Sequence, residues 1–146
     1  MIRMAQSDDL GGILLLYTHL HKGASMPQMN SALANAWKEI CKNDNHSIIV
    51  AEENGKIVAS CTIVIIENLT HQSRPFAVVE NVVTHEKYRG MGLAKKCMEY
   101  ACELARVRNC YKIMLMSSKE RDGAHKFYEK CDFNSTDKKA FIKRLD

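Results

Sequence analysis

Three consecutive stretches decide the fold expected for this chain: FAVVENVVT at residues 76–84, HEKYRGM at 85–91 and GLAKKCMEYACELARV at 92–107. The first stretch is rich in β-branched residues and is typical of a buried strand. The last stretch repeats apolar residues at helical spacing, with Leu93, Cys97 and Ala101 on one face. Another apolar run follows at 113–116. The chain therefore makes a strand–helix–strand crossover, which requires two parallel strands.

The rest of the chain alternates helical and extended patterns around this crossover. The short turn Glu53-Asn54-Gly55-Lys56 joins two apolar runs, which must then be antiparallel. Together the patterns predict an α/β (α+β) fold in one domain spanning residues 1–146, with a mixed, mostly antiparallel sheet and helices on both faces. The other expected elements are a strand at 2–5, a helix capped by Ser7-Asp8-Asp9, a helix at 27–42, strands at 47–51 and 57–66, a helix at 124–130 and a last strand at 139–143.

Composition and charge narrow the class of protein. The net charge of +4 is mild and basic residues occur only in pairs such as Lys95-Lys96, so we expect no nucleic-acid partner. This bias suits a small polyanionic ligand, or is an incidental surface surplus. The six cysteines form no Cys-x-x-Cys pair, so we expect free thiols in a reducing cytoplasm and no metal. Residues 1–6 lack a signal-peptide pattern, and no apolar run approaches the roughly 20 residues of a membrane span.

The turn between the strand and the long helix reads Arg89-Gly90-Met91-Gly92-Leu93-Ala94. Two glycines let a ligand approach the backbone closely, and a helix N-terminus exposes unpaired N–H groups, so the turn is suited to a pyrophosphate. A dinucleotide site is excluded, because Lys95 stands where a third glycine belongs and the next strand ends in Met116-Ser117-Ser118 without an acid. On these residues alone, a purely structural turn stays open.

Two motifs together resemble the GCN5-related N-acetyltransferase (GNAT) family. The turn Arg89-x-x-Gly92-x-Ala94 is similar to the family's Arg/Gln-x-x-Gly-x-Gly/Ala motif. The segment AHKFYEKCDF at 124–133 is similar to its Ala-x-x-Phe/Tyr-Tyr-Glu-Lys-x-Gly-Phe segment, with Asp132 in place of the glycine. The order of elements also agrees over nearly the whole chain. The resemblance implies a central parallel strand pair that splays apart, and acetyl-coenzyme A (acetyl-CoA) as cosubstrate.

The resemblance also implies where CoA binds. The pantetheine arm enters the gap between the parallel strands and pairs with the backbone of the first, while amides of the glycine turn hold the pyrophosphate. Two serines at the end of the second strand flank the arm. The cofactor-binding residues implied in this way are Val82, Val83, Arg89, Gly90, Met91, Gly92, Leu93, Ala94, Lys95, Ser117 and Ser118.

The resemblance leads us to assign the chemistry to two side chains. An amine must lose a proton before it attacks the thioester, and Glu80 is the expected general base, on the same strand face as Val82. Such a carboxylate within a Val-rich strand needs a partner or a task, and a structural salt bridge is the alternative. Tyr128 matches the position that protonates the departing thiolate, or it packs structurally. Arg121 stands where the family often has asparagine.

The acceptor is less defined than the donor. The stretch Cys110-Tyr111-Lys112-Ile113 and the run 127–131 are similar to glucosamine-phosphate N-acetyltransferases, and Arg74 suits a phosphorylated amino sugar. Those enzymes usually have Glu-Asp where this chain has Glu80-Asn81. Polyamines, aminoglycosides and a protein N-terminus stay open as primary-amine acceptors, and so does a CoA-binding regulatory module without transfer activity. A homodimer is common in the family, but the sequence gives no oligomeric state.

Overall fold

Helices and strands follow one another in the predicted order until the last expected strand. In the computed structural model, which describes all 146 residues, the elements are β1 (Ile2–Met4), the 3₁₀ turn η1 (Ser7–Asp9), α1 (Leu10–Tyr17), α2 (Ser31–Lys42), β2 (His46–Glu53), β3 (Lys56–Ile66), β4 (Phe76–Thr84), the 3₁₀ turn η2 (Glu86–Tyr88), α3 (Leu93–Val107), β5 (Ile113–Leu115) and α4 (Asp122–Glu129).

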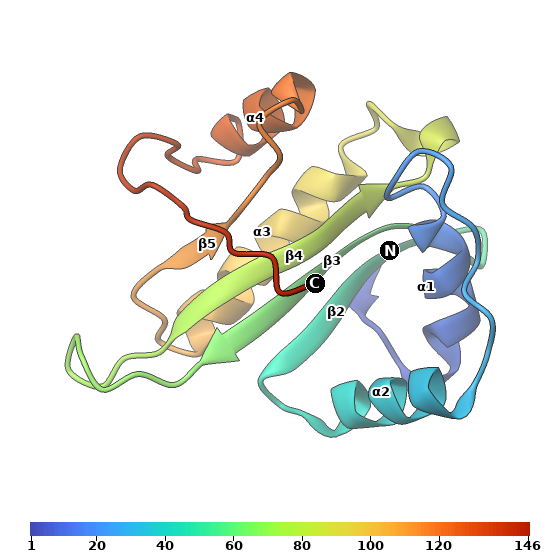
Figure 1. Cartoon of the computed structure of the whole chain (residues 1–146), viewed down its shortest axis with the longest axis horizontal. Coiled ribbons are helices and arrows are strands. Elements are labelled where there is room, and N and C mark those ends of the chain that lie inside the picture. The colour runs from blue at the N-terminus through green and yellow to red at the C-terminus, as the bar shows by residue number, and fades with distance from the viewer.

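The five strands form one sheet in the order β1-β2-β3-β4-β5 (Figure 1). Every neighbouring pair is antiparallel except β4 and β5, which are parallel. Asn54 and Gly55 form the two-residue turn between β2 and β3 with φ of 50° and 73°, the positive values that the tightest hairpins require. The mixed sheet predicted from the sequence is confirmed. Its parallel pair lies at one edge and not at the centre as expected, because no strand forms beyond β5.

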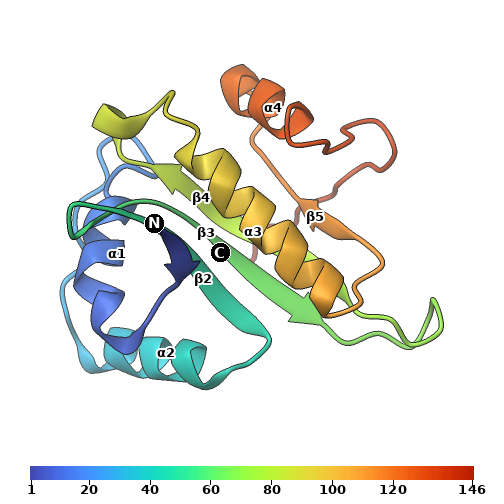
Figure 2. The same cartoon turned by 180° about the vertical axis from the view of Figure 1, so that it is seen from behind.

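Helix α3 covers one face of the sheet, and α1 and α2 lie on the other (Figures 1 and 2). The predicted apolar face of α3 is confirmed, since Leu93, Cys97 and Ala101 are buried against β3 and β4 together with Met98. Fully burying a side chain such as Met98 contributes about 1.5–3 kcal/mol. This packing fixes the N-terminus of α3 close to the end of β4.

Six free cysteines are present, and two of them belong to this core. The Cys61 thiol of β3 donates a hydrogen bond to the Cys97 carbonyl of α3 at 3.5 Å. Burial raises the pKa of Cys97 to about 12, and it raises the pKa of Cys61 as well. The two thiols therefore serve as small apolar core residues. Cys41, by contrast, is exposed.

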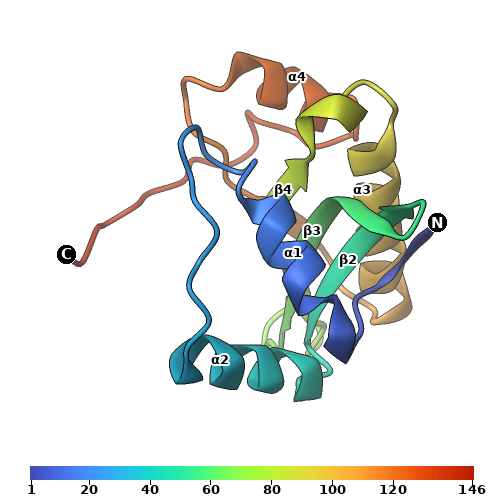
Figure 3. The same cartoon turned by 90° about the vertical axis from the view of Figure 1, so that its right-hand side faces the viewer.

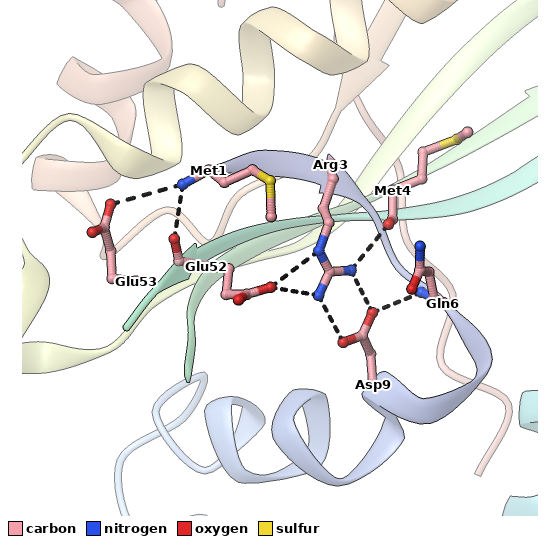
Figure 4. A network of polar contacts seen from close by, with 7 residues as sticks. All are labelled: Met1, Arg3, Met4, Gln6, Asp9, Glu52 and Glu53. Carbon is pink, nitrogen blue, oxygen red and sulfur yellow. Dashed lines mark hydrogen bonds and ion pairs between the residues drawn. The ribbon is translucent and has the colours of Figure 1, made fainter. Parts of the chain in front are cut away.

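The N-terminal strand is held by a network of ionic contacts (Figure 4). The Arg3 guanidinium donates to both Asp9 carboxylate oxygens at 2.6 and 2.9 Å, and also to Oε2 of Glu52 at 2.7 Å. The Arg3 guanidinium holds the pKa of Asp9 below its usual range. Asp9 also accepts the Gln6 backbone N–H at 2.7 Å, so one carboxylate fixes β1, η1 and the start of α1 together.

The second helix starts later than predicted. Its first residue is Ser31, because the Asn30 side chain caps it by accepting the Leu33 N–H at 2.9 Å. Pro27 therefore lies outside the helix, in the preceding coil. The Trp37 indole N–H of α2 donates to the Ser7 carbonyl at 2.9 Å and ties this helix to η1.

The strand predicted at residues 139–143 does not form, and the prediction is wrong. The chain turns after α4 at Asp132, whose φ of 65° is a left-handed conformation that aspartate tolerates better than most residues, and then runs on without helix or strand. As a result β5 is the last strand of the sheet. None of the helices is both long enough and apolar enough to cross a bilayer.

Candidate active site

Strand β4 contains a β-bulge at its centre. The β3–β4 register pairs Thr62 with Glu80 and Ser60 with Val83, so Asn81 and Val82 together oppose Cys61. Asn81 has a φ of 52°, a left-handed conformation that asparagine tolerates better than most residues. A bulge bends its strand and interrupts the alternation of its side chains. No pattern in the sequence predicted this bulge.

The bulge overturns two expectations about Glu80. Val82 packs against the core under α3, whereas Glu80 lies opposite Thr62 on the face toward α1. The prediction that Glu80 and Val82 share a face is therefore wrong, because the inserted Asn81 shifts the alternation. Glu80 is also exposed and takes part in no ion pair. Its carboxylate therefore carries no desolvation cost, and the expectation that it needs an ion-pair partner or a catalytic role does not hold.

Strands β4 and β5 part just before the bulge. They pair only from Ala77–Val79 to Ile113–Leu115, while β4 continues to Thr84 and the chain after β5 leaves toward α4 (Figure 1). From Glu80 onward the backbone of β4 has no strand partner on this side. An extended ligand with amide groups, such as a pantetheine arm, can pair with backbone groups at such an open edge.

The two predicted serines lie on the other side of this parting, directly after β5. The Ser117 hydroxyl is buried and has no hydrogen-bond partner within the protein. A buried hydroxyl without a partner costs about 1–3 kcal/mol, so a ligand group or an ordered water is expected to complete it. The Ser118 carbonyl accepts the Nε2 hydrogen of His125 at 2.7 Å, which ties this segment to α4.

The glycine turn lies where β4 ends. Gly90 and Gly92 have φ of 79° and 76°, and a Cβ built on either would meet no atom within 4 Å. Gly92 precedes α3 as its N-cap and has no side chain to cap the helix. The backbone N–H groups of the first turn therefore donate to no side-chain cap. A 15-residue helix with an uncapped, open N-terminus is suited to an anion. These features fit the pyrophosphate of CoA.

The other residues of the turn have differing surroundings. Arg89 is exposed, with its Nε 3.5 Å from the Thr84 carbonyl, and Met91 is 59% exposed. The Leu93 side chain is buried in the core and Ala94 is half-buried, so only their backbones can serve a ligand. The Lys95 ammonium lies 3.8 Å from Glu99 on the exposed side of α3.

Tyr128 lies in α4 and packs against the core between the sheet and α3. Its ring packs against Phe127 and Phe133, with centroid distances of 5.2 and 6.2 Å. Burial raises the pKa of Tyr128, Arg121 counteracts this, and Glu80 adds to it. The structure thus brings the two predicted catalytic side chains within electrostatic reach of each other. It also places the Arg121 charge near the hydroxyl, which the sequence did not indicate.

A cluster of buried hydroxyls lies behind the bulge. Burial raises the pKa of Tyr17, at the end of α1, and the nearby side chains of Thr62, Ser60 and Asn81 offset part of that effect. The hydroxyls of Tyr17, Ser60 and Thr62 nevertheless have no hydrogen-bond partner of good geometry. The sequence signal was two hydroxyls at alternate positions within the apolar run of β3, and it was missed.

Two histidines meet between the end of α1 and η2. The rings of His19 and His85 have centroids 4.1 Å apart, and His85 also contacts Tyr88 edge-on at 5.6 Å. Desolvation, with a smaller contribution from His19, lowers the pKa of His85. The His19–His85 contact joins the coil after α1 to η2, which leads into the glycine turn. The coil and η2 therefore lie together beside the candidate site.

Arg74 lies away from this site. Its guanidinium donates to the carbonyls of Asn109 and Cys110, both at 3.1 Å, beside the start of β5. The expectation that Arg74 suits a phosphorylated acceptor is therefore not supported by its position. An open hollow of about 560 Å³ lies at residues 39–46, between α2 and β2, and involves none of the predicted site residues.

Comparisons with known proteins identify the family and agree with this fold. Residues 14–133 match the model of the acetyltransferase (GNAT) family. A glucosamine 6-phosphate N-acetyltransferase from Trypanosoma brucei brucei is 29% identical over 153 residues, covering 99% of this chain and 94% of that protein.

Solved structures have the same architecture. A protein from Agrobacterium tumefaciens str. C58 is 37% identical with a TM-score of 0.90, covering 99% of each chain. An aminoglycoside N-acetyltransferase in complex with CoA has a TM-score of 0.79 over the whole of both chains, and at 17% identity it supports the fold alone.

Proposed function

This chain belongs to the GNAT family of acetyltransferases, and on that premise we propose that it moves the acetyl group of acetyl-CoA to the primary amine of a small molecule by direct attack on the thioester. The observation that carries the proposal is the parting of β4 from β5 beside an open glycine turn. The proposed site needs no metal. An acceptor bound at the parting meets the thioester at the bulge of β4.

The donor is held at two places. Backbone amides from Arg89 to Lys95, at the positive end of α3, bind the pyrophosphate. The pantetheine arm lies along Val82 and Val83, and the orphan hydroxyl of Ser117 and the neighbouring Ser118 contact its other side. The charge-assisted hydrogen bonds to the pyrophosphate contribute about 1.5–3 kcal/mol each.

The amine must be neutral to attack. An alkyl ammonium has a pKa near ~10.4, so a base must take its proton at neutral pH. Glu80 is the proposed base, acting directly or through water, since it is exposed at the bulge. The amine nitrogen then bonds to the thioester carbon, and a backbone N–H near Val82 stabilises the oxyanion that forms.

Collapse of this intermediate breaks the carbon–sulfur bond and releases the CoA thiolate. Burial keeps the Tyr128 hydroxyl protonated at neutral pH, because it raises the pKa of that residue. Tyr128 therefore has a proton to give to the thiolate, and the charge of Arg121 stabilises the phenolate left behind. The proton removed from the ammonium leaves through Glu80 to solvent. The second proton, which the nitrogen loses as the amide forms, passes through water to the Tyr128 phenolate and restores its hydroxyl.

The acceptor class is proposed from a relative rather than from Arg74. The Trypanosoma relative is named for glucosamine 6-phosphate, and the match spans nearly all of both proteins. A phosphorylated amino sugar is therefore the first acceptor to test. Aminoglycosides, polyamines and an N-terminal peptide complete the panel.

The test measures CoA release from acetyl-CoA across this amine panel. Release is followed by chromatography, because the exposed thiol of Cys41 would react with a thiol-sensitive dye. Acetylated amine formed in step with CoA supports the proposal. Tight binding of CoA with no release for any amine would instead support a regulatory module without transfer activity.

The role of Glu80 has a separate test. Glu80→Gln should lower kcat and remove the acidic limb of the pH–rate profile, while Glu103→Gln on the solvent side of α3 serves as the matched control. A profile that keeps its acidic limb in Glu80→Gln excludes Glu80 as the base without affecting the proposal of acetyl transfer.

A further inference from the structure

The hydroxyl cluster behind the bulge lies on the face of the sheet that α1 covers. Ser60 and Thr62 alternate with Cys61 along β3, and the Cys61 thiol bonds to α3, so the two hydroxyl side chains face α1. Figure 3 shows α1 lying against this face of the sheet, with α3 on the other. Tyr17, the last residue of α1, completes the cluster. None of these hydroxyls takes part in the steps proposed above.

The cluster is buried, and its hydrogen bonds are incomplete. Ser60 is 0% and Thr62 is 5% exposed, and their hydroxyls, like that of Tyr17, have no partner of good geometry. Buried polar groups without a partner are rare in folded proteins, and each one requires an explanation. Burial raises the pKa of Tyr17, so its hydroxyl stays protonated at neutral pH and can donate a hydrogen bond.

The bulge places a strained residue next to this donor. Asn81 has a φ of 52°, and its side chain lies beside the Tyr17 hydroxyl. A left-handed residue other than glycine persists only where its surroundings hold it. The β3–β4 ladder does not hold Asn81, because the inserted residue of a bulge is left out of the pairing. The Asn81 side chain is therefore the group through which α1 can fix the bulge.

We propose that Tyr17 is a positioning residue for acetyl transfer, whose hydroxyl donates to the Asn81 side-chain oxygen once the pantetheine arm is bound and so holds the bulge of β4 in place. This inference rests on the proposed function, in which a backbone N–H near Val82 stabilises the oxyanion. Hydrogen bonds that serve catalysis are often poorly aligned in the free enzyme and tighten when substrate binds. A bulge that shifts moves this N–H out of line with the thioester oxygen, whereas the glycine turn keeps its shape.

The loss of this hydroxyl should affect the chemical step. Removing an oxyanion donor altogether lowers kcat by about 10²–10³-fold. Tyr17→Phe keeps the N–H but loosens its position, so we expect a smaller fall in kcat, of roughly tenfold. The affinity for CoA and the KM for the amine should stay within about twofold of the native values, because the buried hydroxyl touches neither ligand.

Two comparisons show whether the hydroxyl acts through Asn81. Tyr100→Phe is the matched control, because Tyr100 is a half-buried tyrosine of α3 that packs on the other face of the sheet, and its kcat should equal that of the native chain. In Asn81→Gly the bulge needs no support, because glycine adopts a positive φ readily. Adding Tyr17→Phe to Asn81→Gly should therefore lower kcat by less than about twofold.

The kinetic test uses the full chain with acetyl-CoA and the amine of the panel that gives the fastest release of CoA. Tyr17→Phe deletes an oxygen that has no partner, so the variant should fold, and urea unfolding checks this. Thr62→Val removes a second hydroxyl of the cluster and should lower kcat in the same direction, which gives an independent variant.

A second measurement does not need turnover. Relaxation dispersion of the backbone amides of Asn81 and Val82 is recorded on the chain bound to CoA, since it detects exchange between conformations on the μs–ms timescale. Both amides should be free of exchange in the native chain and in Tyr100→Phe, and should show exchange in Tyr17→Phe. If no amine is acetylated, the proposed function fails, and this measurement still decides whether Tyr17 holds the bulge.

Four results would overturn the proposal. One is a native kcat in Tyr17→Phe, and another is dispersion in that variant that matches the native chain. The third is a raised KM for the amine at unchanged kcat, because Tyr17 would then contact the acceptor itself. The fourth is an equal fall in kcat when Tyr17→Phe is made in the native chain and in Asn81→Gly, since the hydroxyl would then act by a route other than the bulge.

Discussion

Replacing Gly92 by alanine separates the strain of the glycine turn from its role in binding CoA. Gly92 has a φ of 76°, and nothing lies within 4 Å of the Cβ that alanine would add. A left-handed residue other than glycine costs about 1–2 kcal/mol. Alanine also lowers the entropy of the unfolded chain, which offsets about 0.4–1 kcal/mol. The net loss of unfolding free energy should be about 1 kcal/mol.

The effect on CoA should exceed this loss of stability. The added methyl would stand in the open space where the pyrophosphate approaches the backbone, and it would disturb one charge-assisted hydrogen bond of about 1.5–3 kcal/mol. Since about 1.4 kcal/mol is a factor of ten, CoA should bind roughly 10- to 100-fold more weakly. Isothermal titration calorimetry with CoA, beside urea unfolding, measures both quantities.

Gly55 offers a matched control. It has a φ of 73° and equally open surroundings, but it lies in the β2–β3 turn. Gly55→Ala should lose similar stability and bind CoA as the native chain does. Native affinity in Gly92→Ala would refute the assignment of the turn to the pyrophosphate. Equal weakening in both variants would show that loss of stability, and not the turn, controls binding.

Three further predictions follow from side-chain surroundings. Tyr128→Phe should lower kcat roughly 10²–10⁴-fold with little change in CoA affinity, whereas Tyr111→Phe, at the other end of β5, should leave steady-state kinetics intact. Asp9→Asn should lower the unfolding free energy at pH 7 by about 1.5–3 kcal/mol. Because the folded-state pKa of Asp9 is depressed, this deficit in urea melts should begin to shrink as the pH falls below about 4 and should be lost only once Asp9 is protonated in the folded protein as well. Cys97, whose pKa burial raises to about 12, should resist iodoacetamide in the folded protein while exposed Cys41 reacts, as mass spectrometry would show; rapid labelling of Cys97 would contradict its place in the core.

Local patterns determined most of the elements. The strand 76–84 was predicted with its observed bounds, and the helix that follows was predicted to within a residue, because both bury one continuous apolar face whose period is visible in the chain. The Asn54-Gly55 turn needs positive φ at two residues, a requirement that only a few dipeptides meet. The glycine turn is local in the same way, and the expected coenzyme came from the family resemblance that this turn and the segment 124–133 carry together.

Contacts between distant residues decided the rest. The bulge at Asn81 arises from the register of β4 against β3, so no window of sequence could place Glu80 on one face and Val82 on the other. The approach of Arg121 to Tyr128, and of Tyr17 to Thr62, likewise depends on how helices pack on the sheet. The sequence by itself determined the strand–turn–helix that a CoA pyrophosphate would occupy. Only the tertiary structure decided which side chains face the parting of β4 and β5, and that no strand forms at residues 139–143, because pairing and packing are set by neighbours far away in sequence.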